Sequence, residues 1–308
     1  MNPQPTDSPQ DGGLEGRTAV VTGANSGIGL QTVIGLARRG ASVVLACRDQ
    51  ERGAAALQTA RKASGSDRLE LRSLDLANLA SIRGFARDWT GALDILVNNA
   101  GVMATPLRHT VDGFEQQFGI NHLGHFALTG LLLGALRSSP SGRVVTVSSL
   151  AHRRGRIDFS DLNAHGRYRS WKAYGQSKLA NLLFTMELDR RLRAAGWPLI
   201  ACAAHPGLST TNLTNGVRGA AVLDLLGGAI RVMGQSDADG AKPILLAATG
   251  AQVRGGDYYG PDGAGETRGN PVLVAPAPAV LDPVTAARLW SASEELTGVR
   301  YQDLPAAP

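Results

Sequence analysis

The chain alternates regularly between short apolar runs and segments with helical spacing of their apolar side chains, and this alternation narrows the choice of fold more than any other feature. The apolar runs, each as long as a strand, cover residues 18–22, 42–47, 69–74, 93–97, 143–148 and 199–204. The helical segments cover residues 28–39, 50–62, 79–89, 111–137, 171–194 and 283–296. Short apolar strands that alternate with helices are typical of a parallel sheet covered on both faces. With right-handed crossovers, the pattern predicts an α/β fold with a doubly wound parallel sheet.

No linker or internal repeat interrupts this alternation, so we expect a single domain over residues 16–300. Residues 1–15 are rich in proline, glycine, aspartate and glutamine and are expected to form a disordered leader, and residues 301–308 a tail. Residues 212–240 combine apolar side chains with several glycines and fit either a substrate lid or packing on the core. Residues 260–280, rich in glycine, proline and alanine, are expected to be irregular.

Composition excludes several classes of protein. Hydrophobic residues make up 43% of the chain and charged residues 19%, enough apolar material to bury a core. No apolar run approaches the roughly 20 residues that span a bilayer, and the first residues are polar, so neither a membrane segment nor a signal peptide is expected. Two cysteines exclude a disulfide scaffold and suggest the reducing cytoplasm. The net charge of +5 comes from scattered arginines without interleaved aromatics, which argues against a nucleic-acid partner.

A glycine-rich segment follows the first apolar run directly. In TGANSGIG, residues 22–29, glycines stand at Gly23, Gly27 and Gly29 with the spacing G-x-x-x-G-x-G. Glycines allow a tight turn and bring backbone N–H groups close to a pyrophosphate at the start of a helix, where the helix dipole favours anions. The spacing differs from the common dinucleotide fingerprint. Its place between the first strand and the first helix nevertheless predicts the phosphate-binding turn of a Rossmann-type site.

The end of the second strand indicates which dinucleotide is bound. An acid at this position binds the ribose of NAD, whereas an arginine accommodates the 2′-phosphate of NADP. The strand ends on Cys47, and Arg48 follows at once. Asp49 is a plausible N-cap of the next helix, which removes it as a competitor for the ribose. The sequence therefore predicts NADP(H) as the cofactor, with Arg48 at the phosphate, although Arg48 could also be a solvated loop residue.

With these features the chain resembles the short-chain dehydrogenase/reductase superfamily from about residue 16 to about residue 297. The resemblance is carried by the turn at 22–29, Leu74-Asp75-Leu76, Asn98-Asn99-Ala100-Gly101, Asn121, Ser148-Ser149, Tyr174-x-x-x-Lys178, and His205-Pro206-Gly207 with Thr211. It implies cofactor contacts from Gly23, Asn25, Ser26, Gly27, Ile28, Gly29, Arg48, Asp75, Leu76, Asn98, Ala100, Gly101, Tyr174, Lys178, Pro206, Gly207 and Thr211. It implies Asn121, Ser149, Tyr174 and Lys178 as catalytic residues.

Longer stretches of sequence point to one branch of that superfamily. Residues 44–49, 118–126 and 173–184 are similar to the retinol-dehydrogenase-like group, which also contains the WW-domain oxidoreductase and mostly uses NADP. Animal members often begin with a hydrophobic anchor, whereas this chain begins with a polar leader. We therefore expect a soluble relative and carry over no retinoid specificity. The superfamily is often dimeric or tetrameric, so a homodimer or homotetramer is expected.

The catalytic residues suit proton transfer to or from a carbonyl or alcohol oxygen. Tyr174 and Lys178 are four residues apart and project from one helix face. A nearby ammonium is expected to lower the pKa of the phenol from its usual value near 10. Ser149 would donate a hydrogen bond to the substrate oxygen, and it is preferred to Ser148 because it lies just past the strand. By resemblance, Asn121 would hold a water that relays protons from Lys178 to solvent.

The predicted function is thus hydride transfer between NADP(H) and an apolar small molecule, interconverting a carbonyl and an alcohol. Two alternatives stay open: a non-catalytic regulator that senses NADP(H), and reduction of an activated C=C bond on the same scaffold. His122 and His125 are spaced as metal ligands can be, but no third ligand is evident, so no metal is expected. Cys47 and Cys202 are expected to be buried. Residues 153–169 are expected to form a loop near the substrate entrance.

Overall fold

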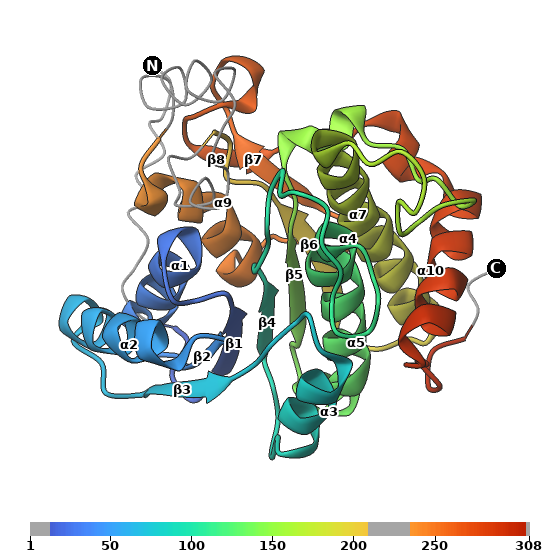
Figure 1. Cartoon of the computed structure of the whole chain (residues 1–308). Helices are drawn as coiled ribbons and strands as arrows, with labels where there is room; N and C mark the ends of the chain where they lie inside the picture. Colours follow the sequence, from blue (N-terminus) through green and yellow to red (C-terminus); the bar gives the residue numbers. More distant parts are fainter. Residues whose placement is uncertain (1–12, 209–234, 306–308) are drawn as a thin grey trace.

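The computed structural model describes residues 13–208 and 235–305 of the chain. In this part, eight strands form one sheet in the order β3-β2-β1-β4-β5-β6-β7-β8, parallel except for the last pair. The strands are β1 (Thr18–Thr22), β2 (Ser42–Cys47), β3 (Leu69–Ser73), β4 (Ile95–Asn98), β5 (Arg143–Val147), β6 (Ile200–Ala204), β7 (Tyr258–Pro261) and β8 (Pro271–Leu273). The strand order reverses between β1 and β4, which is the point where doubly wound sheets bind ligands. The predicted fold class is confirmed (Figure 1).

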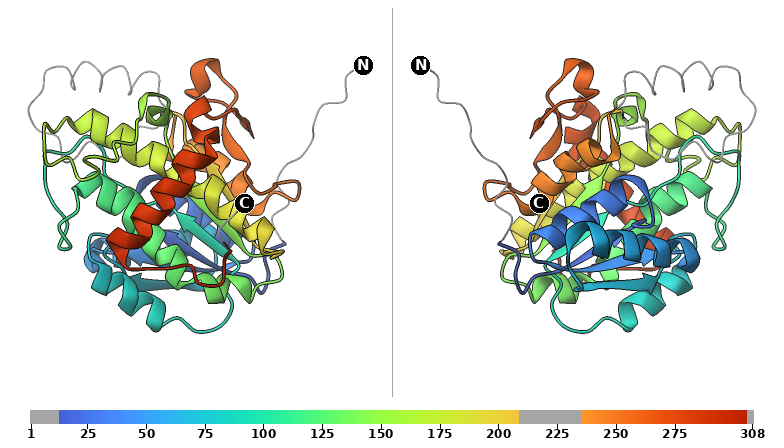
Figure 2. Two further views of the ribbon diagram at one scale, coloured as in Figure 1. Left: turned by 90° about the vertical axis from the view of Figure 1, so that its right-hand side faces the viewer. Right: turned by 90° about the vertical axis from the view of Figure 1, so that its left-hand side faces the viewer.

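Helices cover both faces of the sheet (Figures 1 and 2). One face carries α1 (Gly27–Arg38), α2 (Gln50–Ser64) and α9 (Asp237–Thr249), which bury apolar side chains of β1 and β2. The other face carries α3 (Leu79–Arg87), α5 (Gly124–Leu131), α6 (Leu133–Arg137), α7 (Ser170–Ala194) and α10 (Pro283–Thr297). The central strands are buried on both sides, which explains their continuous apolar sequences. No helix in the described ranges is both long enough and apolar enough to span a bilayer.

The helix expected over residues 111–137 differs from the prediction in both its start and its continuity. It begins as α4 (Gln116–Phe118), where Glu115 accepts hydrogen bonds from the backbone N–H groups of Gln117 and Phe118. It then passes through a π-helical turn, η1 (Gly119–Leu123), before α5, and is interrupted again before α6. Single π turns within α-helices frequently mark functional sites. This one contains Asn121, so the interruption lies at a residue that sequence analysis had assigned to catalysis.

The C-terminal third contains strands and short helices that its amino-acid composition did not predict. Residues 260–280 were expected to be irregular, but they contribute the second half of β7, all of β8, the short 3-10 helix η4 (Ala264–Glu266) and most of η5 (Pro278–Leu281). Both strands are very short and rich in glycine or proline, so they give no strand pattern. Of the lid expected at 212–240, residues 212–234 lie outside the described residues, and 237–240 open α9.

The chain end also packs more closely than expected. Tyr301 is buried and donates a hydrogen bond from its hydroxyl to the Phe126 carbonyl, and Leu304 is buried nearby. The core therefore continues past the boundary expected at residue 300. The leader expected at 1–15 falls mostly outside the described residues, which begin at 13.

Candidate active site

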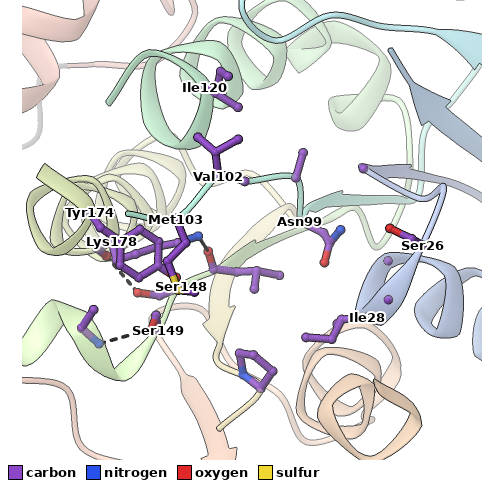
Figure 3. A pocket seen from close by; sticks show the side chains of 18 of the residues that line it. Ser26, Ile28, Asn99, Val102, Met103, Ile120, Ser148, Ser149, Tyr174 and Lys178 are labelled. Carbon is purple, nitrogen blue, oxygen red and sulfur yellow. Dashed lines mark hydrogen bonds between the residues drawn. The ribbon is translucent and has the colours of Figure 1, made fainter. Parts of the chain in front are cut away.

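One cavity of about 1230 Å³ runs along the carboxyl ends of the central strands (Figure 3). Most of the predicted site residues line it: Gly23, Asn25, Ser26, Gly27, Ile28, Gly29, Arg48, Asp75, Leu76, Ala100, Gly101, Ser149, Tyr174, Lys178, Pro206 and Gly207. Ser149, Tyr174 and Lys178 gather at one end of the cavity, and Ser26 and Ile28 lie toward the other. Asn98 and Asn121 do not line it, and Thr211 lies outside the described residues.

The glycine-rich turn between β1 and α1 is shaped by close backbone approaches. Gly23 has φ +65°, and a Cβ there would lie 2.8 Å from the Cα of Ala100. A Cβ at Gly29 would lie 2.5 Å from the Gly23 carbonyl oxygen. Larger residues are therefore excluded at both positions. The Ser26 side chain makes no capping hydrogen bond to α1, so the first amides of the helix stay available to an anion in the cavity.

Two arginines line the cavity beyond the end of β2. Arg48 follows the strand, and Arg52 lies in the first turn of α2. Asp49 caps α2 as predicted, accepting a hydrogen bond from the Arg52 N–H at 3.0 Å. Within the described ranges neither guanidinium forms an ion pair, so both are available to a phosphate. Sequence analysis missed Arg52, although its spacing of four residues from Arg48 was a readable signal.

The segment after β4 forms the floor of the cavity through contacts with Thr22. The Thr22 hydroxyl oxygen accepts hydrogen bonds from the Asn99 and Ala100 N–H groups, both at 2.9 Å. Asn98, predicted to contact the cofactor, instead points into the core, where its side-chain amide donates to Thr129. Its neighbour Asn99 lines the cavity in its place. The structure thus places Asn99 rather than Asn98 at the cavity, because alternate residues of a strand end face opposite sides of the sheet.

The two serines after β5 have different hydrogen bonds. Ser148 donates its hydroxyl proton to the Lys178 carbonyl at 2.8 Å, so that proton is engaged within the protein. The Ser149 oxygen accepts from the Ala151 N–H at 3.2 Å, which leaves its proton free to be donated. Ser149 also forms a hydrogen bond with the Tyr174 phenol. These contacts favour Ser149 over Ser148 as the donor to a substrate oxygen.

The pKa of Tyr174 is shifted against expectation. Burial raises the pKa of the phenol above its usual value near 10, and the hydrogen bond with Ser149 opposes this only in part. Lys178, whose ammonium lies 5.8 Å from the centre of the Tyr174 ring and donates to the Val147 carbonyl at 3.1 Å, does not reverse this rise. Burial lowers the pKa of Lys178 itself to about 8. Near neutral pH the site therefore holds a protonated phenol beside a charged lysine, which suits proton donation.

Asn121 is held within the protein and does not face the substrate. Its side-chain amide donates to the Val102 carbonyl and to the Ser177 hydroxyl, both at 2.9 Å, and its oxygen accepts from the Val102 N–H. A Cβ at Gly101 would lie 3.2 Å from the Asn121 Oδ1 and 3.5 Å from the Lys178 Nζ. Asn121 and Lys178 therefore flank Gly101, and the relay water expected between them stays a prediction.

Three loops meet at the rim of the cavity through Glu266, which sequence analysis missed. His205 is buried, accepts from the Gly207 N–H through Nδ1, and donates from Nε2 to Glu266 at 3.0 Å. Burial lowers the pKa of His205 to about 4, so this contact is a neutral hydrogen bond rather than an ion pair. The other Glu266 oxygen accepts from Arg153 at 2.6 Å. Glu266 has φ +57°, a strained conformation that occurs at functional sites.

The catalytic end of the cavity has a largely apolar wall. Met103 and the exposed side chain of Trp171 line it near Tyr174, Leu150 follows Ser149, and Leu208 also lines the cavity. The Trp171 ring meets the Tyr174 ring edge to face, with centroids 6.1 Å apart. Arg153 and Arg154 place the start of the predicted 153–169 loop at this entrance.

The remaining cysteine and histidine predictions concern groups outside the catalytic end. Cys47 and Cys202 are free and buried, as predicted. No group of three potential metal ligands occurs among the residues that the structure describes. His122 and His125 make separate contacts, with Ser293 and Thr22 respectively.

Comparison with known proteins finds relatives by sequence profile, by sequence identity and by structure. The sequence profile of the family described as short chain dehydrogenase matches residues 17–221. Retinol dehydrogenase 13 from Homo sapiens is 43% identical over 96% of this chain and 91% of its own length. The crystal structure of an uncharacterized protein from Mycobacterium Paratuberculosis is 45% identical, covers 95% of this chain and 97% of its own, and has a TM-score of 0.79. An NAD(P) dependent gluconate 5-dehydrogenase structure from Beutenbergia cavernae with bound NADP is 28% identical, covers 77% and 91% of the two chains, and has a TM-score of 0.61.

Proposed function

This chain belongs to the short-chain dehydrogenase family, in its retinol-dehydrogenase-like branch, and on that premise we propose that it is an NADP(H)-dependent oxidoreductase that interconverts a carbonyl and an alcohol. The substrate is an apolar small molecule. The observation that carries the proposal is that one cavity joins an uncapped helix start at Ser26 to the Ser149, Tyr174 and Lys178 side chains. A cavity of about 1230 Å³ exceeds the ~300–1,000 Å³ common for one small ligand, so it has room for a dinucleotide and a substrate.

The residues present fit a bound NADP(H). The close-packed turn at Gly23 and Gly29 and the amides of α1 suit the pyrophosphate, and Arg48 and Arg52 suit the 2′-phosphate. No carboxylate takes the ribose position at the end of β2, since Asp49 caps α2. The bound NADP in the Beutenbergia relative supports the same choice. When bound, the cofactor supplies or accepts the hydride.

In the direction of carbonyl reduction, Tyr174 transfers its phenolic proton to the carbonyl oxygen as negative charge develops there. Ser149 donates a hydrogen bond to the same oxygen and holds it near the phenol. Lys178 places a positive charge beside the tyrosine, which favours the phenolate that remains after the transfer. The raised pKa of Tyr174 keeps the acid protonated before the reaction.

The wall formed by Met103, Leu150 and Trp171 supports an apolar substrate. The human relative is named a retinol dehydrogenase, and retinol is an apolar alcohol. That name supports the class of substrate proposed here and does not identify retinol as the substrate of this chain. A cytoplasmic location and a homodimer or homotetramer stay predictions.

The proposal is tested by NADPH consumption over a panel of apolar aldehydes, ketones, quinones and steroids, with NADPH binding measured on the same samples. We expect tight NADPH binding and turnover of at least one carbonyl compound, with an alcohol as product. A saturated ketone from an enone would instead indicate reduction of the C=C bond. Binding without turnover on any compound would contradict the proposed enzyme and favour a regulator that senses NADP(H).

The rate of reduction is expected to depend on pH through Lys178. Its pKa of about 8 means that the ammonium is charged below pH 8 and loses its proton above it. Since the charged form supports Tyr174, kcat/KM for NADPH should be flat up to about pH 7 and fall through about pH 8. Replacing Lys178 by arginine keeps the charge to higher pH and should move the fall upward. A wild-type profile that stays flat to pH 10 would contradict this role.

A further inference from the structure

Two buried histidines on the segment around the π turn have different surroundings. His125 points toward the sheet, where its Nε2 lies 2.8 Å from the Thr22 hydroxyl and its Nδ1 lies 2.9 Å from the Asn121 carbonyl. His122 points away, toward α10, where its Nε2 lies 2.8 Å from the Ser293 hydroxyl. His122 packs among aromatic rings, and its Nδ1 has no partner among the described residues. Only His125 therefore contacts a residue that supports the cavity wall, since Thr22 accepts hydrogen bonds from Asn99 and Ala100, which line the cavity.

The contacts of His125 fix where its proton lies. A carbonyl oxygen can only accept, so Nδ1 carries the proton and donates it to Asn121. The imidazole is neutral, because burial lowers the pKa of His125 to about 4. Nε2 is then unprotonated and accepts the hydroxyl proton of Thr22 at 2.8 Å, a shorter contact than the 3.3 Å from the same hydroxyl to the Val97 carbonyl. Because the Thr22 hydroxyl donates its proton to His125, both lone pairs of the Thr22 oxygen can accept hydrogen bonds from the N–H groups of Asn99 and Ala100.

His125 thus connects the two parts of the site from behind. Through Thr22 it fixes Asn99 and Ala100, which line the cavity where the cofactor is expected. Through the Asn121 peptide it holds the π turn, whose Asn121 side chain donates to Ser177. Ser177 in turn donates to the Tyr174 carbonyl on α7.

We propose that His125 is a positioning residue that aligns the cofactor-binding wall with the catalytic helix face, acting through Thr22 and Asn121 without touching substrate. The proposal rests on the proposed function for its kinetic consequences. Its effect on cofactor binding can be measured even if no substrate is turned over. Small displacements of positioning groups lower rates on the order of 100-fold, so an effect of that size is the upper expectation.

The test compares His125→Phe with His122→Phe, since both replace a buried histidine by a ring of similar size. For His125→Phe we expect a 10-fold to 100-fold loss, as an order of magnitude, in kcat/KM for NADPH, with a raised Kd and a lowered kcat. For His122→Phe we expect a change in Tm but less than about a threefold change in both constants. Equal losses in the two variants, or an unchanged Kd and kcat in a folded His125→Phe, would overturn the proposal.

Further variants separate alignment from stability. His125→Asn keeps an N–H donor near the Nδ1 position and should restore part of kcat relative to His125→Phe. If His125→Phe does not fold, Thr22→Val and Thr22→Ser test the same link, since serine keeps the hydroxyl and valine removes it. We expect Thr22→Ser to bind NADPH like the wild type and Thr22→Val to bind it more weakly. Equal binding by the two Thr22 variants would contradict the link. NADPH is titrated directly by fluorescence, so failure of turnover alone would count against the proposed function and not against His125.

Discussion

Replacing Tyr174 by phenylalanine is expected to lower kcat for carbonyl reduction by about 1,000-fold while NADPH binding stays within about threefold of the wild type. The change removes one oxygen atom, and with it the proton that the substrate oxygen would receive. The ring stays, so the contacts with Trp171 and Lys178 should persist. The measurement is the rate of NADPH oxidation at saturating substrate, together with a fluorescence titration of NADPH.

Tyr259→Phe provides a matched control, because the Tyr259 hydroxyl donates to Asp257 near the far edge of the sheet and does not line the cavity. It should cost about 1 kcal/mol of stability, typical of a lost hydrogen bond, and leave turnover unchanged. Turnover by Tyr174→Phe at the wild-type rate would show that the phenol is not the proton donor. Loss of NADPH binding in the same variant would mean that the ring, rather than the proton, is needed.

Replacing Arg48 by aspartate is expected to reverse or abolish the preference for NADPH over NADH. Arg48 lines the cavity just past β2, without an ion pair to another described residue. A hydrogen bond to a charged group contributes about 1.5–3 kcal/mol, and aspartate adds repulsion, so the ratio of the two Kd values should shift by about 100-fold. Binding of NADPH should weaken strongly and binding of NADH little.

Arg48→Asp changes the net charge of the chain, so the control variant must change the net charge by the same amount. Arg87→Asp does so on α3, where Arg87 is exposed and outside the cavity, and it should leave both Kd values unchanged. Arg52→Ala is expected to weaken NADPH binding less than Arg48→Asp, since it removes one guanidinium and adds no negative charge. Equal affinity of the wild type for NADH and NADPH would contradict the role assigned to Arg48.

The sequence predicted those features that local pattern determines. The first six strands, the glycine-rich turn, the cap at Asp49 and the pairing of Tyr174 with Lys178 all depend on residues close in sequence. The π turn at η1 could not be predicted, because the apolar spacing of its residues resembles that of an ordinary helix. The close packing at Gly119, where a Cβ would lie 2.6 Å from the Thr110 side chain, is likewise not visible in the sequence. The predicted lowering of the Tyr174 pKa was wrong in direction, because burial of the phenol in the assembled fold raises the pKa more than a neighbouring charge lowers it.

Glu266 was missed for a related reason. It lies 61 residues from His205 and 113 from Arg153, in a stretch whose composition predicts only irregular chain. Nothing local to Glu266 indicates that it reaches the cavity, because its partners are brought to it by β6 and by the segment after β5. Contacts of this kind become visible only when the strand order is known.

The junction of Arg153, Glu266 and His205 limits how the substrate range of this enzyme can be redesigned. Exchanging residues 153–169 for a loop without an arginine at position 153 would leave the Glu266 carboxylate with only a buried, neutral histidine beside it. An unpaired, partly buried charge is costly, so the graft would disturb the turn at Gly207 as well as the entrance. A transplant that keeps cofactor affinity must therefore carry the 264–267 segment with it. The two loops form one exchangeable unit although they lie far apart in the chain.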